Sequence, residues 1–149
     1  INLRELIYQA DLVVGAVLIP GAKAPNLITR KDLKNMKHRA VFVDVAIDQG
    51  GCAETSRPTT HTEPIYIEEE VVHYCVANIP GAVGTTSTYA LTNMTFPYCL
   101  QVANQGWKKA AMANPDLRAG LNVVNGKITH QAVADALGVE HTPVEEILN

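Results

Sequence analysis

The residues of this sequence best suited to chemistry follow three apolar runs, in the segments 17–21, 46–51 and 77–81. Each segment enters a turn that contains glycine, where the backbone can approach a ligand closely. Asp48 is the most conspicuous polar residue among them, because a carboxylate just past a buried strand can orient a substrate, accept a proton or stabilise a cation. In the alternative interpretation, Asp48 only caps the glycine turn that follows it. The pattern leaves both interpretations open.

Other reactive side chains carry weaker indications. Arg57 lies in a polar loop and could meet a phosphate or a carboxylate, although a solvated loop arginine is the commoner case. Asp44 and His73 lie inside apolar runs, and we interpret both as structural hydrogen-bond partners. Cys52 follows the glycine turn and is expected to be a buried, unreactive thiol. The five histidines are scattered along the chain, which argues against a metal cluster.

The elements that must position these residues alternate between helix and strand over residues 1–80. Continuous apolar runs predict three buried strands, and apolar residues at helical spacing predict a helix before the first of them. These elements are the strands at 11–17, 40–46 and 71–77 and the helix at 3–9. Strands that are apolar on both faces favour a parallel sheet with crossover helices. In such a sheet ligands bind beyond the carboxyl ends of the strands, where the three glycine-containing segments lie.

Short patterns between the strands predict how they are connected. Thr29 is the expected N-cap of a short helix, with Asp32 in the place of a capping-box acid. Leu33 and Met36 would form the inner face of that helix. The acidic run from Glu68 to Glu70 is interpreted as an exposed helical turn.

From residue 85 onwards the pattern becomes mainly helical. Apolar spacing predicts a helix over 88–111, with a kink near Pro97. The other predicted elements are a hairpin on Asn125 and Gly126, a helix at 130–137 that Gly138 ends, and an apolar turn at 144–148. The change of pattern at 80–86 is the predicted internal boundary.

Composition and charge exclude several classes of protein. Twelve basic and 15 acidic residues give a net charge of −3, so the chain has no electrostatic footprint for nucleic acid. Hydrophobic residues make up 47% of the chain, which supplies a core and excludes general disorder. No apolar stretch approaches the roughly 20 residues that span a bilayer. Three widely spaced cysteines match neither a disulfide framework nor a zinc site, so we expect a cytoplasmic protein.

Five longer strings go beyond these general patterns. They are GAVLIPGAKAP at 15–25, VDVAIDQGGC at 43–52, SRPTT at 56–60, YCVANIPG at 74–81 and TSTYALTN at 86–93. With them the chain resembles the C-terminal part of an alanine dehydrogenase along essentially all of its length. The nearest related family, the NAD-binding subunit of proton-translocating transhydrogenase, shares the GAKAP and QGG elements. It typically carries glutamate where Asp48 stands, so Asp48 favours the dehydrogenase.

The resemblance implies an NAD-dependent enzyme that oxidises L-alanine to pyruvate and ammonia and also runs the reverse amination. It implies that Asp48 is the catalytic aspartate, which helps to bind and deprotonate the amino group. It also implies that Asn78 lies near the nicotinamide. The implied cofactor-lining residues are Val17, Leu18, Val45, Ala46, Ile47, Asp48, Arg57, Val76, Ala77, Asn78 and Ile79. Members of the family are similar in forming homohexamers, so we expect a homo-oligomer.

The same resemblance implies how the chain is divided. Residues 1–83 would form the C-terminal half of a Rossmann-like NAD-binding domain of the α/β class. Residues 84–149 would form a helix that crosses back to the substrate domain, followed by the C-terminal part of that domain. Hydride transfer needs a cofactor held against the substrate with water excluded, and a cleft between two domains supplies that geometry.

Two departures from the family limit these expectations. No Gly-x-Gly-x-x-Gly motif follows a strand, and the family's catalytic histidine, substrate-binding lysine and substrate-binding arginine lie upstream of Ile1. We therefore expect the chain to be a piece of a longer enzyme and to be inactive alone. Some members also carry Glu and His one helical turn apart on the crossing helix, suited to a divalent ion. Gln101 and Gln105 occupy those positions here, so we predict no metal there.

Two alternative functions stay open at this point. The first is an NAD-binding component of a transhydrogenase, which would bind NAD(H) but ignore alanine. The second is a catalytically inactive module that only packs against partner subunits. Alanine-dependent reduction of NAD distinguishes the dehydrogenase from both alternatives.

Overall fold

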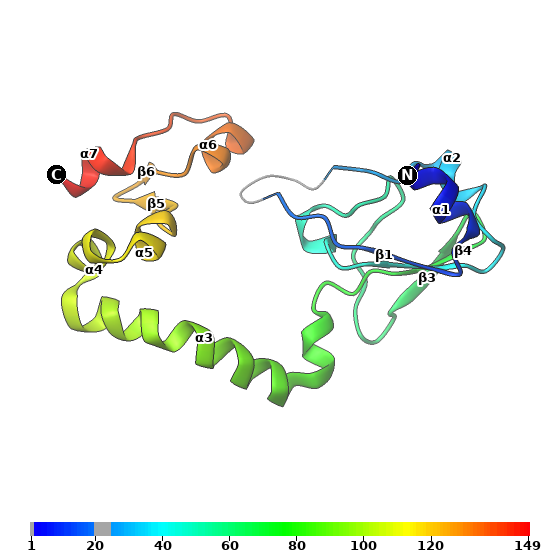
Figure 1. The fold of residues 1–149 in the computed structure, drawn as a ribbon, viewed down its shortest axis with the longest axis horizontal. Helices are drawn as coiled ribbons and strands as arrows, with labels where there is room; N and C mark the ends of the chain where they lie inside the picture. The colour runs from blue at the N-terminus through cyan, green and yellow to red at the C-terminus, as the bar shows by residue number, and fades with distance from the viewer. Residues whose placement is uncertain (1, 20–24) are drawn as a thin grey trace. The chain divides into compact units, whose positions relative to one another are not determined.

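The computed structural model describes residues 2–19 and 25–149, and these residues fall into two compact units. The first unit comprises the described residues up to 82, and the second begins at residue 83 (Figure 1). The turn that the sequence predicts at residues 20–21 lies outside the described residues. Each unit is considered by itself below.

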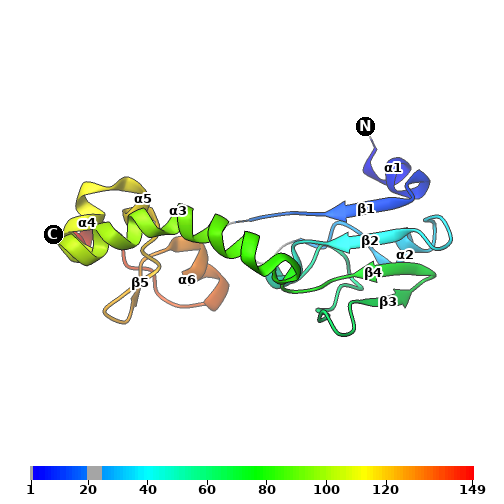
Figure 2. The same ribbon diagram turned by 90° about the horizontal axis from the view of Figure 1, so that it is seen from below.

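The first unit holds a four-stranded sheet with short helices. Its elements are α1 (Leu3–Gln9), β1 (Leu12–Gly15), α2 (Arg30–Leu33), β2 (Val41–Asp44), the 3₁₀ helix η1 (Ile47–Gln49), β3 (Ile65–Glu68), β4 (Val71–Tyr74) and all but the last residue of the 3₁₀ helix η2 (Ile79–Val83). The strand order is β1-β2-β4-β3 (Figure 2). Strands β1, β2 and β4 are parallel, and β3 is antiparallel to β4. The three predicted strands and the predicted first helix are therefore confirmed, and the sequence did not predict β3.

The register of the parallel strands brings their carboxyl ends to one edge of the sheet. Gly15 of β1 pairs with Asp44 of β2, and Val43 of β2 pairs with Tyr74 of β4. Residues paired in register lie side by side across a sheet. The segments that follow Gly15, Asp44 and Tyr74 therefore leave from the same edge, which we call the carboxyl edge.

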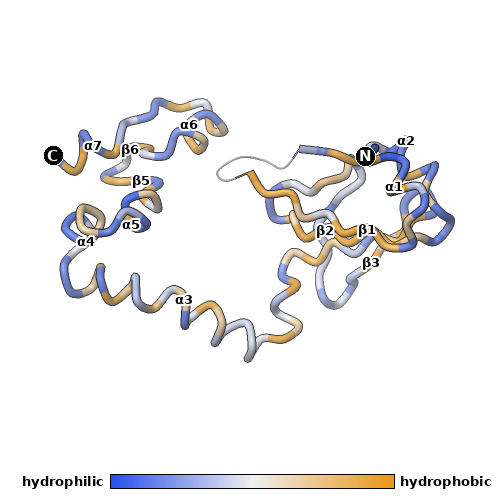
Figure 3. Tube along the Cα trace, in the orientation of Figure 1, coloured by the Kyte–Doolittle hydropathy of each residue, from blue (hydrophilic) through white to orange (hydrophobic). Residues whose placement is uncertain are grey.

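The hydrophobic core lies against one face of the sheet. Phe42 of β2 is completely buried there and belongs to the same cluster as Leu33 and Met36, which confirms the predicted inner face of the α2 segment. On the opposite face Leu12 and Val14 are each 57% exposed. Because successive side chains of a strand point to opposite faces, this alternation shows that only one face is covered within the first unit. Figure 3 shows that β1 and β2 are hydrophobic along their length.

The capping box predicted at the start of α2 is present. The Oγ1 of Thr29 accepts a hydrogen bond from the Asp32 backbone N–H (3.2 Å), and the Thr29 N–H donates to Asp32 Oδ2 (3.0 Å). The buried Asp32 carboxylate also accepts from the hydroxyl of Tyr8 (2.9 Å) and from Nε of Arg4 (3.0 Å). Burial alone would raise the pKa of this carboxyl, but the hydrogen bonds outweigh it and lower the pKa to about 2.

The helical turn predicted over the acidic run is wrong. Glu68 ends β3, and Glu69 and Glu70 form the two-residue turn of a hairpin, with φ of 48° and 63°. Left-handed φ at both central residues matches the twist of a tight hairpin. The guanidinium of Arg30 pairs with Glu68 (2.5 Å) and Glu69 (2.8 Å), and the backbone N–H of Arg39 donates to the carbonyl of Glu70 (2.9 Å). These long-range partners stabilise a turn that the charge run alone does not indicate.

The second unit is mainly helical. Its elements are α3 (Gly84–Gln105), α4 (Trp107–Ala113), α5 (Pro115–Ala119), β5 (Val123–Val124), β6 (Lys127–Ile128), α6 (Gln131–Leu137) and α7 (Val144–Leu148). The hairpin on Asn125 and Gly126 is confirmed, with φ of 51° and 78° at its two turn residues. Gly138 ends α6 in the left-handed conformation, as the sequence predicts.

The long predicted helix is divided at Gly106. Helix α3 continues through Pro97 to Gln105, and Gly106 has a φ of 75°, which separates α3 from α4. No residue of α3 is buried. No helix in the described part of the chain is both long enough and apolar enough to cross a bilayer.

Candidate functional site

The carboxyl edge of the sheet carries a hollow of about 300 Å³ between the segments that follow β1 and β2. We call it the edge hollow. It brings together five of the eleven predicted site residues, from two segments that are about 30 positions apart in sequence. The lining residues are Ala16, Val17, Leu18, Val45, Ala46, Asp48 and Gln49. The edge at which ligands are expected to bind in a parallel sheet therefore does carry a hollow.

Asp48 lies in η1 and is exposed at the edge hollow. Its carboxylate makes no hydrogen bond or ion pair with any residue that the structure describes. A carboxylate oxygen without protein partners keeps its lone pairs available to an incoming group. Asp48 is therefore placed to accept a proton or to bind a cationic group.

The glycine turn is held by Asp44 and not by Asp48. Asp44 is completely buried at the end of β2 and accepts hydrogen bonds from the backbone N–H groups of Ala46 (3.1 Å) and Cys52 (2.8 Å). Its Oδ2 also accepts from the hydroxyl of Ser56 (2.5 Å). The capping interpretation of Asp48 is therefore wrong, whereas the structural interpretation of Asp44 is confirmed.

Gly51 is required by the packing around Asp44. Its φ is 79°, and a Cβ atom placed on it would overlap Ser56 Cβ and lie 2.9 Å from Asp44 Oδ2. The neighbouring Gly50 also has a left-handed φ, of 101°. Any side chain at Gly51 would therefore separate Ser56 from Asp44 and disturb the turn that carries Asp48.

Arg57 is held beside the sheet by Tyr66. The guanidinium carbon of Arg57 lies 3.8 Å from the centroid of the Tyr66 ring, a cation–π arrangement. The backbone N–H of Arg57 donates to the Tyr66 hydroxyl (3.0 Å), which donates in turn to the carbonyl of Thr55 (2.8 Å). Burial raises the pKa of the Tyr66 hydroxyl, so it stays protonated as this donor. Arg57 is exposed but does not line the edge hollow.

The segment after β4 holds the remaining predicted residues. Ala77 and Asn78 are exposed and Ile79 is half-buried, but Val76 is buried. None of these four residues lines the edge hollow. Ile47 is also buried, in a cluster with Tyr66 and Cys75. Ile47 and Val76 can therefore offer a ligand their backbone more readily than their side chains.

Two further residues near the glycine turn have the structural roles that the sequence indicates. His73 is completely buried, and its Nδ1–H donates to the Val71 carbonyl (2.9 Å), so its Nε2 accepts from the Thr55 hydroxyl (2.9 Å). Burial lowers the pKa of His73, which favours the neutral ring. Cys52 is a buried free thiol, and burial raises its pKa, which makes it unreactive.

Three residues near the site were not singled out from the sequence, although one of them, Gln49, belongs to the candidate segment 46–51. Gln49 lines the edge hollow beside Asp48, and its place in the same glycine turn was an available indication. Tyr66 supports Arg57, and the alternation of residues 65–68 indicates a strand that buries it. His61 contacts the carbonyl of Asn78 (2.6 Å), and no local pattern indicates that contact.

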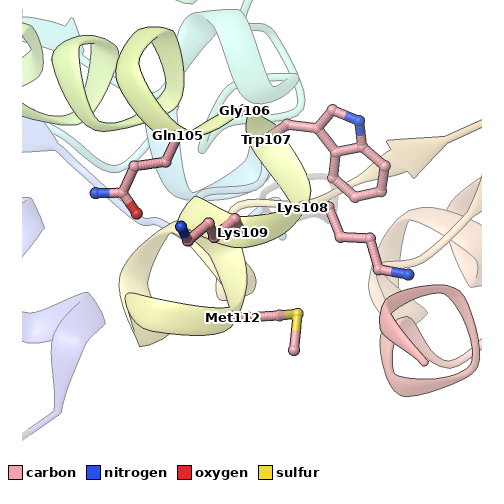
Figure 4. A pocket seen from close by; sticks show the side chains of 6 residues that line it. All are labelled: Gln105, Gly106, Trp107, Lys108, Lys109 and Met112. Carbon is pink, nitrogen blue, oxygen red and sulfur yellow. The ribbon is translucent and has the colours of Figure 1, made fainter.

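A second hollow, of about 380 Å³, lies in the second unit around Gly106. Figure 4 shows the side chains that surround it, including Trp107, Lys108 and Met112. None of the predicted cofactor-lining residues belongs to it. Of the two glutamines at the positions where some family members carry Glu and His, Gln105 lines this hollow, and the Gln101 side-chain oxygen accepts a hydrogen bond from the Asn114 side-chain amide (2.9 Å). Among the described residues, no three His, Cys, Asp or Glu side chains gather as a metal site would require.

Comparison with known protein families gives one consistent result. The family model described as "Alanine dehydrogenase/PNT, C-terminal domain" matches residues 1–131. An alanine dehydrogenase of Halomonas elongata is 56% identical over 146 residues, which cover 98% of this chain and 39% of that protein. An alanine dehydrogenase of Bacillus subtilis is also 56% identical, over 149 residues that cover 99% of this chain and 39% of that protein.

Solved structures agree with the sequence relatives. An L-alanine dehydrogenase has a TM-score of 0.73 at 44% identity, and the match covers 98% of this chain and 38% of that one. A transhydrogenase from Sinorhizobium meliloti has a TM-score of 0.53 at 30% identity, over 58% of this chain and 24% of that one. The Rossmann-like α/β fold class is therefore confirmed. The chain spans about two fifths of the length of the curated relatives it matches.

Proposed function

We propose that this chain takes part in the NAD-dependent oxidation of L-alanine to pyruvate and ammonia and in the reverse reaction. The premise is that the chain belongs to the family of alanine dehydrogenase/PNT C-terminal domains. The observation that carries the proposal is that two aspartates at the carboxyl edge have different environments. Asp44 holds the turn, and Asp48 lines the edge hollow with no partner in the described part of the chain. The 56% identity to alanine dehydrogenases over almost the whole chain supports the same reaction.

The edge hollow fits one ring of NAD in size and lining. Its volume of about 300 Å³ lies at the lower end of the range for ligand pockets, which suits one ring with its ribose better than a whole dinucleotide. Val17, Leu18 and Val45 offer apolar surface to the face of a ring. NAD, when bound, supplies the acceptor for the hydride that leaves the substrate carbon.

Asp48 would accept the proton that the substrate amino group releases in this reaction. Its carboxylate would bind the ammonium group of L-alanine and take a proton from it, so that the nitrogen lone pair becomes available as the hydride leaves. Because no residue that the structure describes donates to it, this carboxylate can make these contacts without first breaking others. Arg57 and the segment 76–79 would contact the cofactor outside the edge hollow, with Asn78 near the nicotinamide.

The organisation of the protein is part of the proposal. Residues 1–83 would supply the C-terminal half of the NAD-binding domain, and residues 84–149 the crossing helix and the C-terminal part of the substrate domain. Homohexamer formation in the cytoplasm is proposed as well. The exposed apolar residues of α3, among them Leu91 and Met94, support packing of this helix in an assembled protein.

A second candidate is the NAD-binding component of a transhydrogenase. It is favoured by the likeness to the transhydrogenase from Sinorhizobium meliloti, which is more distant than the likeness to L-alanine dehydrogenase. Such a component would bind NAD(H) and would not turn over an amino acid. Asp48, where that family typically has glutamate, is the residue that argues against it.

The experiment that tests the proposal measures NADH formation by the purified protein that carries this chain. The protein is supplied with NAD and L-alanine, and with glycine or L-serine in parallel, and the reverse reaction is measured with pyruvate and ammonium. L-Alanine-dependent NADH formation is the expected result. NADH binding without turnover of any amino acid would support the transhydrogenase component, and the absence of both binding and turnover would support an assembly module.

A further inference from the structure

The loop that follows the glycine turn runs back along the carboxyl end of β4. Thr59 forms a parallel bridge with Val76. Its backbone N–H donates to the carbonyl of Cys75 (2.9 Å), and its carbonyl accepts from the N–H of Ala77 (3.2 Å). The Thr59 hydroxyl donates to the carbonyl of Pro64 (3.0 Å), which closes the loop on itself. The chain after β4 is therefore held in register as far as Ala77.

Asn78 is the first residue beyond that register, and His61 holds it. The Nε2 of His61 lies 2.6 Å from the backbone carbonyl oxygen of Asn78. A carbonyl oxygen can only accept, so the hydrogen of this bond is on Nε2. The same oxygen also accepts from the N–H of Gly81 (3.0 Å). Both lone pairs of the Asn78 carbonyl are therefore occupied, which fixes the orientation of this peptide group.

The side chain of Asn78 lies close to Gly81. A Cβ atom placed on Gly81 would lie 2.8 Å from Asn78 Nδ2 and 3.2 Å from His61 Nε2. The amide of Asn78 and the ring of His61 thus both pack over the bare Cα of Gly81. Asn78 and His61 are nevertheless exposed, so the three residues form a small ordered group at the surface of the carboxyl edge.

We propose that His61 is a positioning residue for cofactor binding, because its Nε2–H holds the Asn78 carbonyl and thereby the amide of Asn78. This inference deepens the proposed function and rests on it, since Asn78 belongs to the segment assigned to NAD. His61 acts through Asn78 and needs no contact with the cofactor. Without the Nε2–H donor, only the Gly81 N–H would hold the Asn78 carbonyl, so the peptide group and the amide that it carries would gain freedom.

The test compares His61→Phe, which keeps a ring and removes the donor, with His61→Gln, which keeps an N–H donor of similar reach. The dissociation constant of NADH is measured for the whole protein by fluorescence titration, and the KM for L-alanine is measured at saturating NAD. We expect His61→Phe to weaken NADH binding roughly fivefold, the equivalent of one surface hydrogen bond. The KM for L-alanine stays within about twofold, and His61→Gln restores most of the affinity.

Two further variants complete the design. Gly81→Ala disturbs the same group from the opposite side and is expected to weaken NADH binding to a similar extent. His38→Phe is the matched control, because His38 is an exposed histidine that faces Glu70 (3.8 Å) beyond the amino end of the strands. It should leave NADH affinity unchanged. Faster amide hydrogen exchange at Gly81 in His61→Phe is the expected signature that does not depend on cofactor.

Each contrary outcome has a separate meaning. Unchanged NADH affinity in His61→Phe overturns the positioning role while the proposed function stands. Equal loss in His61→Phe and His61→Gln, with a lower melting temperature in both, also overturns it, because a general structural role then explains the result. Absence of NADH binding by the parent protein overturns the proposed function and this inference with it.

Discussion

The turn after β2 has a buried base and an exposed rim, and each carries an aspartate. At the base, the Asp44 carboxylate is completely buried and accepts three hydrogen bonds from Ala46, Cys52 and Ser56. At the rim, Asp48 is exposed and has no partner among the residues that the structure describes. The two side chains have the same chemistry and lie four positions apart, so their different environments alone determine which of them holds the turn and which is open to a ligand.

The comparison shows how a rigid site can present a free carboxylate. The bonds to Asp44 fix both ends of the turn, at Ala46 and at Cys52, so η1 between them has little freedom. Asp48 is positioned by its backbone, and its oxygens bond to no residue that the structure describes. Holding a reactive group through supporting contacts, and not through its own side chain, is how a site achieves preorganisation.

The largest expected effect on stability comes from removing the charge at the base. In Asp44→Asn the NH₂ group replaces one carboxylate oxygen, so in this buried site a donor would face the backbone N–H of Ala46 or of Cys52 and that hydrogen bond would be lost. We expect the free energy of unfolding to fall by about 3 kcal/mol. Urea titration followed by circular dichroism measures this change. Ser56→Ala, which removes one of the three donors, should cost about 1 kcal/mol, and equal losses in the two variants would contradict the account of the base.

Gly51→Ala tests the space around the base. The added Cβ would be forced against Ser56 and Asp44, at a left-handed φ that alanine disfavours. We expect the protein to lose between about 2 and 3 kcal/mol of stability, measured by the same titration. Gly126→Ala is the matched control, because Gly126 also has a positive φ but open space around its Cα. It should cost only about 1 kcal/mol, and a similar cost in both variants would mean that crowding at Asp44 is unimportant.

A third carboxylate, Asp32, extends the comparison to pH. Its pKa is lowered from 3.8 to about 2 in the folded protein, so its contribution is fully present above the unfolded value. That contribution, about 2 kcal/mol, should disappear as pH falls from about 4 through about 2. Unfolding titrations over this range measure the slope, with Asp32→Asn as the variant that lacks it. Parallel pH dependence in the parent and in Asp32→Asn would refute this assignment.

The smallest expected effect on stability belongs to the rim. Asp48→Asn removes a charge that contacts no described residue, so the free energy of unfolding should change by no more than about 0.5 kcal/mol. The measurement is the same urea titration. A loss comparable to that of Asp44→Asn would show that Asp48 also holds the turn and would erase the distinction between base and rim.

The features that the sequence predicted correctly are those set by local pattern. Apolar runs defined β1, β2 and β4, and parallel pairing then placed their carboxyl ends at one edge. Thr29 with Asp32 defined a cap, and Asn125 with Gly126 defined a hairpin, because each pair acts within a few residues. The edge hollow followed from the same rule about strand ends.

The features that the sequence could not predict depend on distant partners. The sequence indicated a structural role for Asp44 but left open whether Asp48 caps the turn, because the donors that show Asp44 to hold it include Cys52 and Ser56 from beyond η1. The hairpin turn at Glu69 and Glu70 depends on Arg30, some 40 positions earlier. Arg57 and the segment after β4 were candidates from the pattern, but their contacts with the cofactor were implied by the resemblance alone and stay predictions.

The most direct test of the central claim is the turnover of Asp48→Asn in the whole protein, measured together with its affinity for NADH. If Asp48 takes the proton of the amino group, L-alanine-dependent NADH formation should fall by at least about 100-fold, because the amide cannot accept that proton. NADH affinity should stay within about threefold of the parent, since the turn remains held by Asp44. Turnover close to that of the parent would contradict the assignment of Asp48 as the group that accepts the proton.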